Sequence, residues 1–159
     1  MVTHSRIFET NPKLSKENQH RLVNVLRLKP SDSFVITDGK GKEFKAVLKS
    51  RDTYEIESEN VPQREPDIEV SLYCAVSKGD RFERLIEKAV EMGVRYIYPI
   101  LTQRCVVKKP SESKMKRWQN IAITAMLQCG GCLLPQIMQP ADFSQIPAKD
   151  KSSLAVVLH

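Results

Sequence analysis

The 159-residue sequence has no long hydrophobic run, and this absence limits what the chain can be. No apolar stretch approaches the ~20 residues with which a helix crosses a membrane. The opening residues, 1–6, are polar, which is unlike a secretory signal peptide. We therefore expect a cytoplasmic protein that has no membrane partner.

Several motifs of catalysis and cofactor binding are also missing. The sequence has no Gly-x-Gly-x-x-Gly and no Walker-type loop. Its histidines, His4, His20 and His159, do not accompany a Gly-x-Ser-x-Gly, so a hydrolase triad has no support. No cluster of carboxylates and histidines has the spacing of metal ligands, and we expect no metal site.

Cysteine is sparse, with Cys74, Cys105, Cys129 and Cys132 in the whole chain, which fits a reducing compartment. Cys129 and Cys132 form a Cys-x-x-Cys pair that follows a predicted helix, where the helix dipole disfavours a thiolate. A zinc site would need a second close pair, and Cys74 and Cys105 are isolated in the sequence. We interpret the cysteines as small core residues, with thiol or metal chemistry as the less favoured alternative.

Positive charge is in excess, because 25 Lys and Arg residues oppose 19 Asp and Glu residues for a net charge of +6. Such a balance favours polyanions such as nucleic acid, although a basic surface can also serve solubility alone. Between Arg104 and Arg117 six basic residues accompany one acid, Glu112. This clustering favours a nucleic-acid partner.

The first 62 residues predict a small β-rich unit with one helix. Ser15 can cap a helix that runs to about Val25, with Leu22, Val25 and Leu26 on its buried face. Strands over residues 33–37, 43–49 and 53–58 follow, the first two joined by an Asp-Gly turn at residues 38–41. Short strands so close together predict a small barrel, and the proline-containing residues 61–67 predict a linker.

The rest of the chain predicts an α/β domain with a parallel sheet. Apolar runs at residues 71–77 and 96–101 flank a helix over 81–92, with Asp80 and Glu83 as a capping box. Ser111 or Ser113 begins another helix, which ends at Gly130. A third strand around residues 133–138, a loop with one helical turn over 140–151, and a central buried strand at 154–158 complete the prediction. Because such a strand normally leads into a covering helix, we expect a piece of a longer chain or a domain closed by another subunit.

Polar side chains follow two neighbouring strands of the predicted sheet. Lys78 and Arg81 follow the first strand, and Thr102 and Arg104 follow the second. Ligands of such sheets bind at the carboxyl ends of the strands, so these side chains predict a site for an anionic ligand. Gln128, at the end of the second helix, can hydrogen-bond a base or a cofactor, or satisfy the last carbonyls of its helix.

The order of these motifs resembles the ribosomal RNA small subunit methyltransferase E (RsmE) family of the SPOUT class. The resemblance covers nearly the whole chain, and its most specific part is Lys78-Gly-Asp-Arg-Phe-Glu83 to Thr102-Gln-Arg104. It also includes Ser5-Arg-Ile-Phe8, Val25-Leu-Arg-Leu-Lys29, Lys88-Ala-Val-Glu-Met-Gly-Val94, Pro99-Ile100, Arg117-Trp118 and Gln128.

The resemblance implies a PUA-like RNA-binding β-barrel over residues 1–66 and a SPOUT-type methyltransferase domain with a deep knot over 67–159. It implies S-adenosylmethionine as methyl donor, a homodimer, and methylation of N3 of a uridine in 16S ribosomal RNA of the small ribosomal subunit. We expect Thr102 and Gln128 to contact the cofactor, and we assign no catalytic residue. The expected RNA-binding residues are Arg6, Arg27, Lys78, Arg81, Arg104, Lys108 and Lys109.

Two departures from the family pattern concern the methyl donor. The family's Gly-Pro-Glu-Gly-Gly loop and its Leu-Gly-x-x-Ile-Leu-Arg segment do not occur in residues 1–159. The family's Glu-Ala-x-x-Gln-x-x-Arg helix end reads here as Thr124, Ala125, Gln128 and Gly131. We therefore expect a domain truncated at its carboxyl end, without the knot region. The hypothesis is a methyltransferase whose 159 residues do not bind the donor alone; the alternative is a non-catalytic RNA-binding module.

Overall fold

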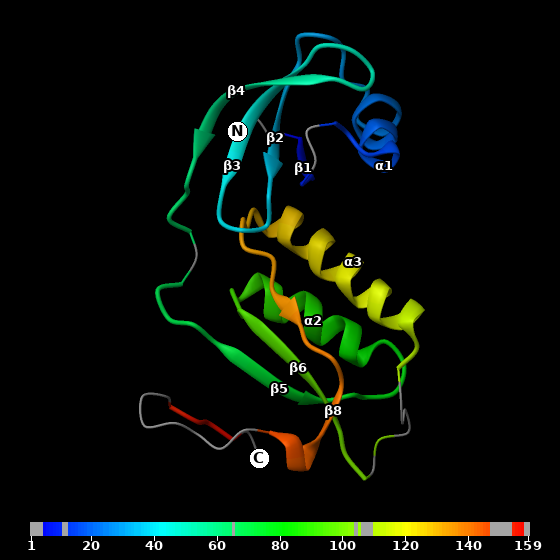
Figure 1. Ribbon diagram of the computed structural model, residues 1–159, viewed down its shortest axis with the longest axis vertical. Coiled ribbons are helices and arrows are strands. Elements are labelled where there is room, and N and C mark those ends of the chain that lie inside the picture. The colour runs from blue at the N-terminus through cyan, green and yellow to red at the C-terminus, as the bar shows by residue number, and fades with distance from the viewer. Residues whose placement is uncertain are drawn as a thin grey trace.

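The computed structural model describes residues 5–10, 13–64, 66–103, 105, 110–146 and 154–157. These residues form two units, each built on its own sheet (Figure 1). The amino-terminal sheet has the strand order β1-β2-β3-β4, in which β1 pairs parallel with β2 and the other neighbours are antiparallel. Its strands are β1 (Arg6–Phe8), β2 (Ser33–Thr37), β3 (Glu43–Leu48) and β4 (Tyr54–Asn60).

The predicted hairpin turn between β2 and β3 is confirmed. The Asp38 carboxylate accepts from the backbone N–H of Lys40 at 2.7 Å and of Lys42 at 3.1 Å, which closes the turn. Alternate residues of the two strands, among them Phe34, Ile36, Ala46 and Leu48, point into a buried core. The other face of β3 and β4 carries exposed ion pairs such as Lys45–Glu57 at 2.7 Å.

The first helical segment begins as predicted at Ser15, whose hydroxyl accepts from the N–H of Asn18. It consists of α1 (Lys16–Gln19) and a π-helical continuation, η1 (His20–Val25). Leu22 is buried, but the expectation that Val25 and Leu26 are buried is wrong, since they are 61% and 40% exposed. The wider π turn, seen in the bond from Leu26 N to Arg21 O, rotates these positions away from the core.

The carboxyl-terminal unit has the predicted parallel sheet. Its central strand β6 (Tyr96–Leu101) pairs on one edge with β5 (Ser71–Ala75). Two short strands, β7 (Gln136–Ile137) and β8 (Ala141–Asp142), pair with successive parts of β6, also in parallel. The predicted third strand is therefore shorter than expected, and the loop after it contains β8 as well as one 3-10 turn, η2 (Phe143–Gln145).

Helices α2 (Arg81–Glu91) and α3 (Glu112–Cys129) pack together against this sheet. Their apolar stripes are buried as the periodicity predicts, and the rings of Phe82 and Trp118 lie 4.6 Å apart between centroids. The side chain of Ser111 caps α3, and Gly130, with φ of 79°, ends it. Of the described helices, none is long and apolar enough to cross a membrane.

Two expectations about apolar residues are wrong. Leu154–Val157 was expected in a central buried strand, yet these four residues form no strand, and Leu154 is 86% and Val157 88% exposed. An apolar run becomes a central strand only when a neighbour pairs with it, and none of the described strands pairs with this segment. Cys129 is exposed rather than in the core, while Cys132 is buried.

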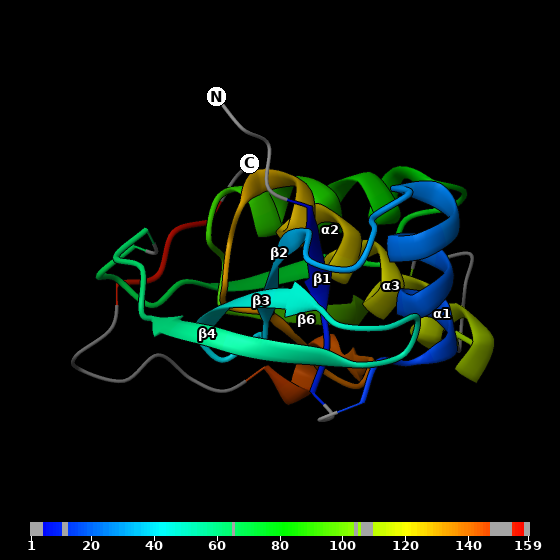
Figure 2. The same ribbon diagram turned by 90° about the horizontal axis from the view of Figure 1, so that it is seen from above.

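The linker and the first helix lie on opposite sides of the amino-terminal unit, as the views from the front and from above both show (Figures 1 and 2). Residues 61–64 have no regular secondary structure, as the sequence predicts. The hairpin between β2 and β3 points toward the carboxyl-terminal end of α3, and this is where the two units meet (Figure 1).

Candidate functional site

Three of the predicted site residues lie at the carboxyl edge of the parallel sheet. β5 and β6 run in the same direction with Ala75 opposite Ile100, so the residues that follow them meet at one edge. Lys78 and Arg81 follow β5, and Thr102 follows β6. Lys78 and Arg81 are exposed, and within the described part of the chain neither side chain has an ion-pair partner. Both positive charges can therefore meet an anionic ligand.

The same edge holds a thiol next to Thr102. The Thr102 N–H donates to Cys105 Sγ at 3.4 Å, and the Thr102 hydroxyl lies 3.4 Å from the same sulfur. These contacts hold the pKa of Cys105 below its ordinary value, first through the hydroxyl and then through the backbone. Burial, and secondly the neighbouring Cys105, raise the pKa of Cys74. The fold thus brings near each other two cysteines that are isolated in the sequence.

The amino end of α2 is tied to α3 by Glu83. Arg117 donates to its two carboxylate oxygens, from Nε at 2.8 Å and from Nη2 at 2.9 Å, a bidentate pair that raises the pKa of Arg117. Asp80 accepts from Arg84 Nη2 at 2.7 Å and makes no capping bond. The predicted capping box is therefore wrong, because both carboxylates bind arginine side chains instead of backbone N–H groups.

The structure does not bring Thr102 and Gln128 together. Thr102 lies at the carboxyl edge of the sheet, whereas Gln128 is exposed in the last turn of α3. The 18 residues of α3 span about 27 Å at 1.5 Å per residue, and its far end meets the amino-terminal unit. Of the two residues expected to contact a cofactor, Thr102 alone lies at the edge where the strands of such sheets present ligands.

The remaining predicted RNA-binding residues are dispersed. Arg27 is exposed on the amino-terminal unit, where its φ is 56°. Arg6 is half-buried, and its Nη2 atom is bound to Glu43 and to two backbone carbonyls, which gives it a structural role. Arg104, Lys108 and Lys109 lie outside the described residues.

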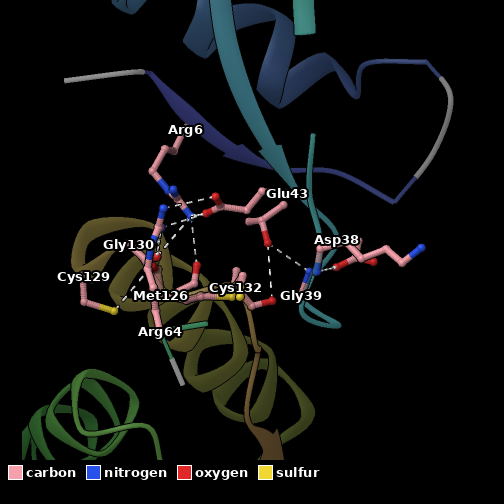
Figure 3. Close-up of polar contacts among 12 residues, drawn as sticks. Arg6, Asp38, Gly39, Glu43, Arg64, Met126, Cys129, Gly130 and Cys132 are labelled. Carbon is pink, nitrogen blue, oxygen red and sulfur yellow. Dashed lines mark hydrogen bonds and ion pairs between the residues drawn. The ribbon is translucent and has the colours of Figure 1, made fainter. Parts of the chain in front are cut away.

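Arg6 belongs to a polar junction between the two units (Figure 3). Glu43, at the start of β3, is 6% exposed and pairs with Arg6 and, through Oε1 at 3.1 Å, with Arg64 Nη1. Arg6 Nη2 also donates to the Gly131 carbonyl at 3.0 Å, and Arg64 Nη1 donates to the Gly130 carbonyl at 2.9 Å. Two arginines from the first unit and the linker therefore satisfy carbonyls at the carboxyl end of α3, where the helix dipole favours positive charge.

Backbone bonds of the β2–β3 turn complete this junction. The Cys132 carbonyl accepts from Gly41 N at 2.9 Å, and the Gly39 carbonyl accepts from Leu134 N at 2.9 Å. The Thr37 hydroxyl donates to the Cys132 carbonyl at 3.4 Å. The sequence analysis did not predict this junction, nor the burial of Glu43 at the start of β3.

Two family models match the chain and divide it between them. Residues 14–57 match an RNA methyltransferase PUA domain, and residues 63–159 match an RNA methyltransferase domain. The second match covers well over half of the chain. The chain belongs to this RNA methyltransferase family. The fold class expected from the sequence, an α/β chain with a PUA-like unit followed by a methyltransferase domain, is confirmed.

Individual relatives agree with this assignment and with the resemblance to RsmE. A Ribosomal RNA small subunit methyltransferase E from Synechocystis is 33% identical over 151 residues, covering 94% of this chain and 50% of the relative. A methyltransferase from Legionella pneumophila, solved with bound S-adenosylmethionine, superposes with a TM-score of 0.87 at 33% identity over 99% of this chain and 71% of that one.

A third relative, solved from Neisseria gonorrhoeae, carries both the family name and the cofactor. This Ribosomal RNA small subunit methyltransferase E, bound to S-adenosylmethionine, has a TM-score of 0.80 and 28% identity, covering 91% of this chain and 66% of that one. The chain spans about half the length of the curated relative from Synechocystis.

Proposed function

We propose that this protein takes part in the S-adenosylmethionine-dependent methylation of 16S ribosomal RNA, at N3 of a uridine. The observation that carries the proposal is the match of residues 63–159 to an RNA methyltransferase domain, joined to a PUA domain match. The names of the relatives and the cofactor in two solved neighbours support the substrate class and the donor.

The RNA surface that we propose begins at the carboxyl edge of the parallel sheet. Lys78 and Arg81 are exposed and free of ion pairs among the described residues, so their charges can replace counterions of a phosphate backbone. Arg27 adds a charge on the PUA-like unit, and Arg104, Lys108 and Lys109 follow β6 in the sequence. We leave Arg6 out of this surface, because its side chain is half-buried and its Nη2 atom is bound to Glu43 and to two carbonyls.

The donor fits the described residues only in part. Thr102 lies at the carboxyl edge, where its backbone N–H and hydroxyl contact Cys105, whereas Gln128 lies at the opposite end of α3. The family's Gly-Pro-Glu-Gly-Gly loop does not occur in residues 1–159. We therefore propose that these 159 residues do not bind the donor unaided, and we route no catalytic step through it.

The proposed reaction sets a requirement on the RNA. N3 lies on the Watson–Crick edge, so the uridine has to be unpaired when it reacts, and its imide proton has to be removed. Domains that recognise single-stranded RNA suit such a target. A division of the chain into residues 1–66 and 67–159, a homodimeric assembly and a cytoplasmic location remain predictions.

The enzyme and the binding-module hypotheses differ in one cellular measurement. We expect deletion of the encoding gene to remove N3-methyluridine from 16S ribosomal RNA, measured by mass spectrometry of its nucleosides. Unchanged N3-methyluridine would rule out the proposed reaction and favour a non-catalytic RNA-binding module. Expression of the 159-residue chain in the deleted strain then tests the donor: restored methylation would show that these residues bind S-adenosylmethionine after all.

A further inference from the structure

A cleft of about 450 Å³ lies between the PUA-like unit and the methyltransferase domain. The first unit contributes Phe8 and the turn of the β2–β3 hairpin to its walls, and the second contributes Gln119 of α3 and the segment Leu134–Met138. The volume is within the range of small-ligand sites. The wall is mainly apolar, with Phe8, Leu134 and Met138 among its members, and a few polar side chains lie between them.

The polar side chains of the cleft are free to bind a ligand. The amides of Gln119 and Gln136 and the ammonium of Lys40 have no hydrogen-bond or ion-pair partner within the described part of the chain. The carboxylate of Asp38, the acid in this wall, is already engaged by two N–H groups of its own turn. An amide offers a donor and an acceptor side by side, which is the pattern needed at the edge of a nucleobase.

The two walls are held in register by close contacts at Gly39. Its carbonyl accepts from Leu134 N at 2.9 Å, and Lys40 forms an antiparallel bridge with Leu133. A Cβ at position 39 would lie 2.9 Å from Phe8 Cε2 and 3.1 Å from Leu134 Cβ. The cleft therefore has fixed walls, which lowers the entropy cost of ordering a ligand there.

The cleft is separate from the sheet edge that carries Lys78 and Thr102. Gln136 pairs with Tyr96, the first residue of β6, and so lies at the amino end of that strand. Ligands of parallel sheets bind at the other end, where Thr102 follows the same strand. A ligand of this cleft is thus distinct from one bound at the carboxyl edge.

We propose that this cleft binds one unpaired nucleotide of the RNA, away from the base that is methylated. The apolar wall contacts the face of the base, Gln119 and Gln136 hydrogen-bond its edge, and Lys40 meets a neighbouring phosphate. Unpaired bases are the part of RNA that proteins read in this way. The inference rests on the proposed function, because it needs an RNA substrate.

The test compares variants of the cleft in binding to a labelled single-stranded fragment of 16S ribosomal RNA. The double variant Gln119→Ala with Gln136→Ala should bind about tenfold more weakly, with an unchanged dependence of log Kd on log salt, because uncharged amides displace no counterions. Lys40→Ala should make that salt slope smaller by about 0.7, from one lost phosphate contact. Asn120→Ala, exposed on the same helix and outside the cleft wall, should bind as the wild type does.

A nuclear magnetic resonance titration separates the possible occupants. Uridine monophosphate should shift the backbone amides of Gly39 and Leu134, whereas S-adenosylmethionine should not. Equal RNA affinity of the double variant and the wild type, with both folded by circular dichroism, would overturn the inference and leave the proposed function standing. Shifts of the same two amides by S-adenosylmethionine would also overturn it. A wild type that binds no RNA would instead refute the proposed function itself.

Discussion

Glu43 is a carboxylate buried between two guanidinium groups, those of Arg6 and Arg64. A buried ion pair adds little stability by itself, because desolvation offsets most of the attraction. Removal of one partner is costly, since the remaining charge stays buried without compensation. Glu43 therefore acts by pairing with the charge of Arg6, whose Nη2 atom also binds a carbonyl at the end of α3, and this joins the two units.

Substitution of Glu43 should destabilise the protein, because it removes one partner of a buried ion pair. We expect Glu43→Ala to lower the free energy of unfolding by about 3 kcal/mol, because the half-buried Arg6 loses its counter-charge. Glu57→Ala is the matched control on the same sheet, since its pair with Lys45 is exposed and water screens it. Urea unfolding of both variants measures the difference. Equal losses would show that burial of Glu43 has no energetic consequence.

Cys105 provides a second prediction for a single residue. Thr102→Val removes the hydroxyl that holds the pKa of the Cys105 thiol down, so the pKa should rise toward its ordinary value. The thiolate is the reactive form, and the rate of alkylation by iodoacetamide at pH 7.5 should fall. Peptide mapping by mass spectrometry measures this rate, with the exposed Cys129 as an internal control. If the alkylation rate of Cys105 depended on pH in the same way in Thr102→Val and in the wild type, the assigned role of Thr102 would be contradicted.

At the scale of elements, the two helices of the methyltransferase domain begin differently. α3 has a capping serine, whose Oγ accepts from the N–H of Lys114 at 3.3 Å. Asp80 precedes α2 and makes no such bond, although aspartate is as good a capping residue as serine. The difference arises because the Asp80 carboxylate binds Arg84, one turn further along the helix.

Substitution of the residue before each helix should have different effects on the stability of the protein. Ser111→Ala should lower the free energy of unfolding by about 1 kcal/mol, the usual cost of a lost cap. Asp80→Ala should leave it nearly unchanged, because only an exposed i,i+4 ion pair is lost. Thermal unfolding followed by circular dichroism compares the two. A larger loss for Asp80→Ala would show that it caps α2 in solution.

Local patterns predicted the elements, whereas contacts between distant segments escaped prediction. The stripe of Phe82 and Ile86, the cap at Ser111 and the turn at Asp38 each depend on residues a few positions apart, so the sequence alone reveals them. Glu43 reads as an exposed strand residue because its partners, Arg6 and Arg64, are distant in the chain. The resemblance assigned Thr102 and Gln128 to one cofactor, but it does not show that the 18 residues of α3 carry Gln128 away from the sheet edge.

At the scale of the whole molecule, the relative position of the two units rests on the close approach at Gly39. Gly39→Ala should destabilise the protein by about 2 kcal/mol more than Gly79→Ala. Both positions have positive φ, of 71° and 73°, so the backbone strain is matched. Only at position 39 does the added Cβ overlap with Phe8 and Leu134, while nothing lies within 4 Å at position 79. Urea unfolding measures the loss of stability in each variant. Equal losses would show that the two units accommodate the added Cβ at position 39 without a further cost in free energy.

The RNA surface belongs to the same scale, because it combines charges from both units. The measurement that tests the account most directly is the affinity for a 16S ribosomal RNA fragment at several salt concentrations. The wild type should show log K falling linearly with log salt, and the double variant Lys78→Ala with Arg81→Ala should show a slope smaller by about 1.4, from two lost phosphate contacts. The control, Lys45→Ala with Lys49→Ala, removes two charges already paired with glutamates and should keep the slope. No measurable RNA binding, or an unchanged slope in the Lys78 and Arg81 variant, would contradict the account.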